Sequence, residues 1–138
     1  MTDVDVHLAW RPLGEVVLQG GKLEFPKPPP LPGVYWLHFP TDDGPGGAYI
    51  GQTDSLPRRF GNYRNPGPTQ HTSLRINALL TSVLLQTGCI EVRVAVEGQV
   101  RVNGRLVSLN MPLKSHRLLA EGAAVVDAQV QGVMLANL

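Results

Sequence analysis

The chain has 138 residues, of which 43% are apolar, so its length suits one ordinary hydrophobic core and a single structural domain. Cys89 is the only cysteine, which excludes an internal disulfide and a cysteine-based zinc site. The net charge of +1 argues mildly against nucleic-acid binding, because affinity for the phosphate backbone depends largely on Lys and Arg. No apolar run approaches the roughly 20 residues of a membrane helix, and the start lacks the order of a secretory signal. We therefore expect a soluble, cytoplasmic protein without a membrane partner.

The first 32 residues predict a β-hairpin followed by a stiff connector. Segments 15–18 and 22–25 flank Gln-Gly-Gly, a sequence that favours a tight turn. The proline-rich segment 26–32 is typical of an extended, polyproline-like spacer, and the alternative is a docking motif for an aromatic groove. We expect residues 1–32 to pack on a core domain formed by residues 33–138.

Two antiparallel strands are predicted next, at residues 34–39 and 48–52, each bounded by Pro or Gly. The Asp-Asp-Gly-Pro-Gly-Gly segment at 42–47 predicts a turn-forming loop between them. This pairing makes Tyr35 and Tyr49 neighbours. On its own, the pattern indicates two aromatic residues that pack against each other.

A short helix is predicted over residues 56–63, with Asp54 or Ser55 as its N-cap. Arg59 and Tyr63 are four residues apart in this segment. That spacing places both side chains on one face of the helix, one turn apart.

A second helix follows the Asn-Pro-Gly-Pro segment at 65–68, which ends the first. Thr72 or Ser73 is its expected N-cap, and it is expected to run to about Thr87 and to be closed by Gly88. Its apolar stripe comprises Ile76, Leu79, Leu80, Val83 and Leu84.

The carboxy-terminal part predicts a strand, a hairpin and a helix. Residues 90–96 alternate between apolar and other side chains, as a half-buried strand does. Asn-Gly at 103–104 indicates a tight turn between 100–102 and 106–109, and a last helix spans about 112–130, opened by its proline. The predicted fold class is therefore α+β: a small central antiparallel sheet flanked by helices, with an added N-terminal hairpin and an inserted hairpin before the last helix.

Two tripeptides, Gly33-Val34-Tyr35 and Tyr49-Ile50-Gly51, carry the most informative pattern in the chain. The residues that follow at tight spacing are Thr53, Leu56, Arg59 and Tyr63. Together they resemble the signature of the GIY-YIG endonuclease superfamily, and the resemblance covers about Gly33 to Asn137. In that family two strands place two tyrosines side by side, the next helix presents an arginine, and a later helix supplies a glutamate that holds one divalent metal ion. The resemblance implies metal-dependent hydrolysis of DNA phosphodiester bonds.

Glu121 lies between Leu118 and Val125 in an apolar stripe of the last predicted helix, and burying an unpaired carboxylate there is costly. The segment 118–121, Leu-Leu-Ala-Glu, resembles the family's Leu-Leu-x-Glu segment, which implies that Glu121 is the ligand of Mg²⁺ or Mn²⁺. A single carboxylate suffices because Mg²⁺ keeps several waters and takes further oxygens from substrate phosphate. The structural alternative is an ion pair with Arg117, one turn earlier.

The resemblance also implies the roles of the catalytic residues, which are Tyr35, Tyr49, Arg59, Tyr63 and Glu121. Tyr35 and Tyr49 would position the attacking water, and one of them, most often the first, is a candidate general base. A phenol has a pKa near 10, so accepting a proton would require nearby positive charge. Arg59 would stabilise negative charge on the non-bridging oxygens. Gln52 stands where several family members carry a basic residue.

The segment from Ser55 to Ile90 contains no Asp or Glu, so it predicts a local basic surface on a near-neutral protein. The substrate-binding residues expected on or near this surface are Arg58, Arg64, His71 and Arg75, with Asn137 as a late residue that braces the site. With Arg59, the segment carries four arginines. This number implies weak, salt-dependent DNA binding by a monomer, so tight recognition would need a homodimer or a protein partner that confers specificity. The alternative function is a catalytically inactive nucleic-acid-binding or protein-interaction module on the same scaffold.

Overall fold

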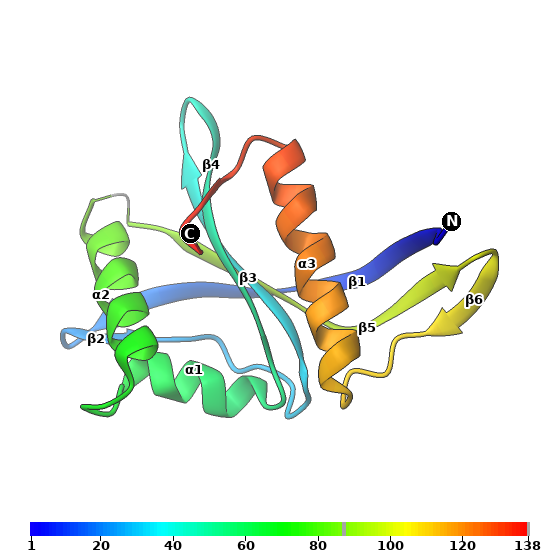
Figure 1. Ribbon diagram of the computed structural model, residues 1–138. Coiled ribbons are helices and arrows are strands. Elements are labelled where there is room, and N and C mark those ends of the chain that lie inside the picture. The colour runs from blue at the N-terminus through cyan, green and yellow to red at the C-terminus, as the bar shows by residue number, and fades with distance from the viewer. Residues whose placement is uncertain (87, 138) are drawn as a thin grey trace.

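The computed structural model describes residues 1–86 and 88–137. The described residues form an α+β fold, in which three helices pack on a mixed, open sheet of seven strands (Figure 1). The elements in chain order are β1 (Val4–Gln19), β2 (Lys22–Glu24), β3 (Gly33–Thr41), β4 (Gly44–Thr53), α1 (Leu56–Arg64), α2 (His71–Gln86), β5 (Ile90–Val102), β6 (Arg105–Ser108), α3 (Lys114–Val130) and β7 (Met134–Leu135). The predicted α+β class is confirmed.

The strand order is β2-β1-β5-β3-β4-β7, and β6 pairs with β5 beside this path. Every pair is antiparallel except β4 with β7, which is parallel. After α3 the chain returns along β4, where the Ala136 amide donates to the Ala48 carbonyl at 2.8 Å. The central strands are antiparallel as predicted, and the sheet is mixed only at this edge. A two-residue strand carries no periodicity that sequence reasoning can detect.

The expected amino-terminal hairpin is present, since β1 and β2 pair across Gly20 and Gly21, which both have positive φ. However, β1 begins at Val4 and pairs with β5 along most of its length, so it is an inner strand of the sheet. Two register shifts interrupt this pairing, between Leu8 and Trp10 and between Pro12 and Gly14. Such irregularities blur the alternation that would have revealed the strand.

The Asn103-Gly104 turn is confirmed, and both residues have the positive φ that a two-residue hairpin turn requires. It joins β6 to β5, which runs without a break from Ile90 to Val102. The predicted inserted hairpin is therefore an extension of the third predicted strand. Figure 1 shows that β6, the end of β5 and the start of β1 project beyond α3 as an arm.

The β3–β4 hairpin is tighter than expected, because Thr41 already pairs with Gly44 and only two residues form the turn. Most of the predicted loop at 42–47 belongs to β4. Gly46 has a φ of +76°, and a Cβ there would lie 2.3 Å from the Phe39 carbonyl oxygen. The glycines thus serve an irregular strand pairing rather than a loop.

Helix α1 confirms its prediction, with the Ser55 hydroxyl accepting a hydrogen bond from the Arg58 amide at 3.3 Å. The predicted cap of α2 is wrong, because the helix begins at His71 and so includes both candidate caps. Ser73 lies inside the helix and is only 4% exposed.

The expected end of α2 near Thr87 lies outside the described residues. Helix α3 begins at Lys114 rather than at the proline two residues earlier.

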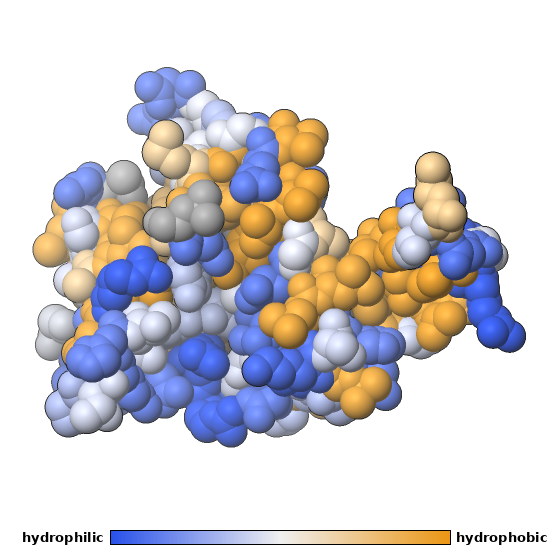
Figure 2. Space-filling model, viewed as in Figure 1, coloured by the Kyte–Doolittle hydropathy of each residue, from blue (hydrophilic) through white to orange (hydrophobic). Residues whose placement is uncertain are grey.

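The two faces of the sheet carry separate hydrophobic clusters, because side chains alternate along β3. Tyr35 and Leu37 face α1 and α2, whereas Val34 and Trp36 face α3. Figure 2 shows apolar surface along α3 and on the projecting arm, and a hydrophilic region at the base of the molecule. Among the described residues, no helix has the length and apolar character needed to cross a membrane.

Candidate active site

Three tyrosines from three elements meet on the α1/α2 face of the sheet and form what we call the tyrosine cluster: Tyr35 of β3, Tyr49 of β4 and Tyr63 of α1. Their ring centroids are 6.1 to 6.3 Å apart. The hydroxyls of Tyr35 and Tyr63 share a hydrogen bond of 2.5 Å. The predicted proximity of Tyr35 and Tyr49 is confirmed, and Tyr63 joins them.

Two glycines of the tripeptide motifs are explained by close packing. Gly51 pairs with Tyr35 across the β3–β4 hairpin, and a Cβ at Gly51 would lie 2.2 Å from the Tyr35 hydroxyl oxygen. A Cβ at Gly33 would lie 2.6 Å from the Ala95 carbonyl oxygen. Glycine is therefore required at position 51 so that the Tyr35 ring can lie across β4, and at position 33 so that β3 can approach β5.

The environment of Tyr35 opposes its expected role as a general base. Burial raises the pKa of Tyr35 well above its ordinary value, and the neighbouring phenols Tyr63 and Tyr49 raise it further. Arg59 acts in the opposite direction but is outweighed. Burial likewise raises the pKa of Tyr63. Tyr35 is 2% exposed and Tyr49 is 9% exposed, so Tyr49 is the phenol nearer to solvent.

Arg59 supplies positive charge beside the tyrosine cluster. Its side chain is half-buried on the face of α1 that carries Tyr63, and its charge acts on both Tyr35 and Tyr63. Within the described part of the chain, the guanidinium forms no side-chain hydrogen bond or ion pair. A guanidinium with unused donors is suited to bind an oxyanion.

Two side chains from distant segments lie at the backbone N–H and C=O groups of Ile50 and Gln52 that point away from β3. We call these backbone groups the β4 edge. Asn137 donates from Nδ2 to the Ile50 carbonyl at 2.5 Å and accepts from the Ile50 amide at 3.0 Å. The Gln52 amide lies close enough to the Glu121 carboxylate to lower its pKa. Amides two residues apart point to the same side of a strand, so Glu121 and Asn137 lie along one edge. The expectation that Asn137 braces the site agrees with this placement.

Glu121 does not form the alternative ion pair with Arg117. Arg117 donates from Nε to the Gln52 side-chain oxygen at 2.8 Å, and from Nη1 to the carbonyls of Met111 and Pro112 at 2.9 Å each. Burial raises the pKa of Glu121, and the nearby Gln52 amide lowers it. The carboxylate is therefore half-buried without a cation among the residues that the structure describes.

The apolar stripe in which Glu121 was expected is not the buried face of α3. Leu118 is 48% exposed. The residues that α3 buries against the sheet are Arg117, Ala120, Ala124 and Ala128. Small side chains let the helix approach the sheet closely, so the leucines turn outward. The buried face was missed because alanine carries less weight than leucine in a hydrophobic pattern.

The expected basic surface is partly neutralised. Arg58 forms an ion pair with Asp54, and Arg64 forms one with Glu24 at 2.7 Å. Both acidic residues lie outside the acid-free segment, so that segment alone could not reveal them. Two further basic residues, His71 and Arg75, carry no ion pair among the described residues.

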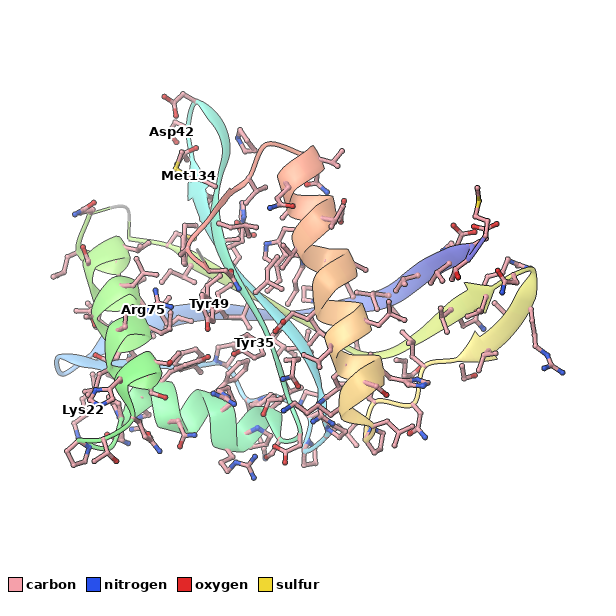
Figure 3. The ribbon with its side chains drawn as sticks, in the orientation of Figure 1. Lys22, Tyr35, Asp42, Tyr49, Arg75 and Met134 are labelled. Carbon is pink, nitrogen blue, oxygen red and sulfur yellow. The ribbon has the colours of Figure 1, made fainter. Side chains whose placement is uncertain are left out.

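Arg75 connects α2 to the carboxy-terminal segment. Its Nη1 donates to the Ala136 carbonyl at 3.4 Å, directly before Asn137. Figure 3 shows Tyr35, Tyr49 and Arg75 in the region between α2 and α3. His71 is exposed at the first position of α2. Of the five expected substrate-binding residues, Arg75 and Asn137 thus lie nearest the β4 edge.

The donor set fits a hard divalent cation. In the described residues no three His, Cys, Asp or Glu side chains gather into a metal site. The site expected from the sequence has only one carboxylate, and Glu121 would leave most positions to water and phosphate oxygen, as Mg²⁺ prefers. Gln52 is a site residue whose contacts sequence reasoning missed. Its amide lies near Glu121, and its side chain accepts from Arg117.

No family model, curated protein or solved structure matches this chain.

Proposed function

We propose that the protein is a divalent-metal-dependent endonuclease that hydrolyses DNA phosphodiester bonds. The observation that carries this proposal is that Arg59, beside the tyrosine cluster, and Glu121, near the Gln52 amide of β4, form no ion pair with the described residues. Strand β4 also carries Tyr49. If the two side chains were structural, each would be expected to pair with an opposite charge. Phosphodiester hydrolysis instead requires a free metal ligand and a free oxyanion donor close together.

The chemistry assigns a separate task to each side chain. Glu121 would hold Mg²⁺ or Mn²⁺, which supplies Lewis acidity at the scissile phosphate. Arg59 would bind the non-bridging oxygens as their negative charge grows. Tyr49 would orient the attacking water, because it is more exposed than Tyr35, whose hydroxyl is engaged by Tyr63. Asn137 would hold the β4 edge in its position beside Glu121 through its two hydrogen bonds to Ile50.

The proposed substrate is DNA in the cytoplasm, and its backbone would approach along Arg75 and His71. Arg58 and Arg64 would contribute less than expected, because each already has an acidic partner. So few contacts favour recognition by a homodimer or with a protein partner. The exposed apolar side chains available for such contacts include Leu113, Leu118 and Leu119 near or on α3 and Leu106 and Val107 on the arm.

The test compares Arg59→Ala and Glu121→Ala with Arg58→Ala as the matched control. We expect each of the first two variants to lose about 100-fold or more of plasmid nicking in Mg²⁺, since each removes a group that acts on the transition state. Arg58→Ala should stay within a few-fold of wild type, because Arg58 is exposed and paired. Circular dichroism checks that every variant is folded. Undiminished cleavage by either Arg59→Ala or Glu121→Ala would reject the proposal.

The second candidate is a nucleic-acid-binding module without turnover. It is favoured by the hydrogen bonds of Asn137 to the β4 edge and by the position of Glu121 near the Gln52 amide, which give both side chains a purely structural task. This candidate predicts that wild-type protein retards DNA at low salt but leaves single-stranded and plasmid DNA intact with Mg²⁺ or Mn²⁺. EDTA should then change neither binding nor DNA integrity.

A further inference from the structure

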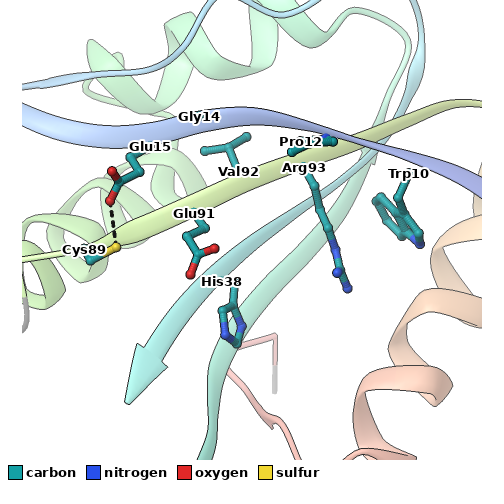
Figure 4. Close-up of a pocket in the computed structure, with 9 residues that line it drawn as sticks. All are labelled: Trp10, Pro12, Gly14, Glu15, His38, Cys89, Glu91, Val92 and Arg93. Carbon is teal, nitrogen blue, oxygen red and sulfur yellow. Dashed lines mark hydrogen bonds between the residues drawn. The ribbon is translucent and has the colours of Figure 1, made fainter. Parts of the chain in front are cut away.

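A cavity of about 650 Å³ lies on the face of the sheet opposite to the tyrosine cluster (Figure 4). We call it the Arg93 cavity, after the residue of β5 that pairs with Trp36 of β3. It is lined by residues of β1, β3 and β5, or next to them, including Trp10, His38 and Glu91. The volume lies within the range of small-ligand sites in proteins. None of its lining residues belongs to the proposed nuclease site.

Arg93 is held in place by two indole rings. Its guanidinium carbon lies 3.9 Å from the ring centroid of Trp36 and 5.1 Å from that of Trp10. The two indoles meet edge to face, with centroids 5.7 Å apart. Stacking of this kind fixes the plane of the guanidinium and leaves its N–H edges available for an acceptor.

Arg93 forms no side-chain hydrogen bond with the residues that the structure describes. Its Nε is buried without a partner among them, and so is Nε1 of the adjacent Trp36. Among the described residues Arg93 forms no ion pair. Buried donors without acceptors are rare in folded proteins, and an oriented, partly desolvated guanidinium binds carboxylate or phosphate oxygens well.

The same cavity also holds two carboxylates that form no ion pair with the described residues. Glu91 pairs directly with Glu15 of β1 and with His38 of β3. Like charges placed directly opposite on neighbouring strands repel each other. Cys89 donates from Sγ to Glu15 at 2.7 Å, the dashed line in Figure 4, but no described Lys or Arg forms an ion pair with either carboxylate. A cationic ligand group between Glu15 and Glu91 would relieve the repulsion.

Positive and negative groups are therefore kept apart within one cavity. Glu91 and Arg93 are two residues apart on β5, so they project from the same face with a Cα spacing of about 6–7 Å. Figure 4 shows both side chains on the same side of the strand. They form no ion pair within 4.0 Å, although Asp127 of α3 and, to a smaller degree, Glu91 act electrostatically on Arg93. A simple anion would face Glu91 and a simple cation would face Arg93, so neither suits the cavity as a whole.

We propose that the Arg93 cavity binds a small zwitterion of the amino-acid class, with its carboxylate on the Arg93 guanidinium and its ammonium group between Glu15 and Glu91. The indole of Trp10 forms a wall beside the aliphatic part of such a ligand. This inference does not depend on the nuclease proposal, because the cavity and the β4 edge share no residue.

The experiment uses intrinsic fluorescence, because Trp10 and Trp36 are the only tryptophans in the chain. Both stack on Arg93, so a ligand on the guanidinium changes their emission. The probes are glycine and 4-aminobutyrate as zwitterions, with acetate and methylammonium chloride as single-charge controls at constant ionic strength. We expect a saturable change with a zwitterion and at least about tenfold weaker binding of both controls.

Variants show whether the change in fluorescence comes from binding in the Arg93 cavity or from a general effect of the added solute. Glu91→Gln, at an exposed position, should weaken zwitterion binding by about tenfold, and Arg93→Met should abolish it. Arg101→Met is the matched control, since Arg101 lies on the same strand outside the cavity. Two results would each overturn the proposal: no saturable change with either zwitterion up to about 100 mM, or zwitterion binding that Glu91→Gln leaves unchanged in the folded protein.

Discussion

The two faces of the sheet differ in whether their buried polar side chains have hydrogen-bond partners. On the α1/α2 face, Tyr35 and Tyr63 are fully buried and satisfy each other with a short hydrogen bond. On the α3 face, the buried nitrogens of Trp36 and Arg93 have no partner among the described residues. The first arrangement stabilises the fold, because its polar groups need nothing from outside. The second leaves two buried donors unsatisfied, one of them on the guanidinium that lines the Arg93 cavity.

The groups with unused binding capacity lie at the margins of these packed faces. Arg59 borders the tyrosine cluster, Glu121 lies at the β4 edge, and Arg93 lines its cavity on the other face. Under the two proposals above, the tyrosine cluster positions the neighbouring charges, and chemistry and binding belong to the groups outside it. Three measurements, taken in order of expected effect, test this division.

The largest effect is expected from Gly51→Ala. The added methyl group would lie 2.2 Å from the Tyr35 hydroxyl oxygen and 2.4 Å from the ring carbon that bears it, so the tyrosine cluster must move. We expect the free energy of unfolding to fall by about 3 kcal/mol or more, measured by urea denaturation.

Gly61→Ala is the matched control, because its methyl group meets nothing within 4 Å in the exposed interior of α1. It should raise the free energy of unfolding by about 0.5–1 kcal/mol. Equal stability of the Gly51→Ala variant and wild type would contradict the packing described for the first face.

A smaller loss is expected from Tyr63→Phe, which leaves the buried Tyr35 hydroxyl without its partner. The cost should be about 1–2 kcal/mol at neutral pH. The pH dependence has a definite sign. Because the pKa of both phenols is raised on folding, the unfolded chain releases their protons first, near pH 10, and stability falls as the pH rises above that value. Tyr63→Phe removes one such group, so its stability should fall less steeply with pH.

Glu121→Gln should have the smallest effect on stability, and in the opposite direction. Burial raises the pKa of Glu121, so its ionised form is disfavoured in the folded state. This penalty is absent at acidic pH and appears as the pH rises through the pKa of the unfolded chain. Without metal, Glu121→Gln should therefore unfold at a slightly higher temperature than wild type at pH 7, and at the same temperature near pH 3.

Added Mg²⁺ then discriminates between a ligand and a structural carboxylate. If Glu121 holds the ion, Mg²⁺ raises the melting temperature of wild type and so reduces the difference between the two proteins. The melting temperature of Glu121→Gln does not respond. Identical Mg²⁺ responses of the two proteins would place any bound ion elsewhere.

Local patterns determined a substantial part of the fold and of the candidate site. The Ser55 cap of α1, the Asn103-Gly104 turn and the alternation in β5 each depend on a few neighbouring residues, and all were readable from the chain. The proximity of Tyr35 and Tyr49 followed from one short hairpin. Such features are predictable because turn geometry, capping and strand periodicity act over distances of a few residues.

Only the tertiary structure decided which distant segments meet. It placed β1 inside the sheet, joined Arg64 to Glu24, and brought the Glu121 carboxylate to the Gln52 amide rather than to Arg117. These outcomes depend on which face of α3 packs on the sheet and on how the last residues return beside β4. Packing of whole elements selects such contacts, and close fit between surfaces far apart in the chain leaves no periodic signal in either segment.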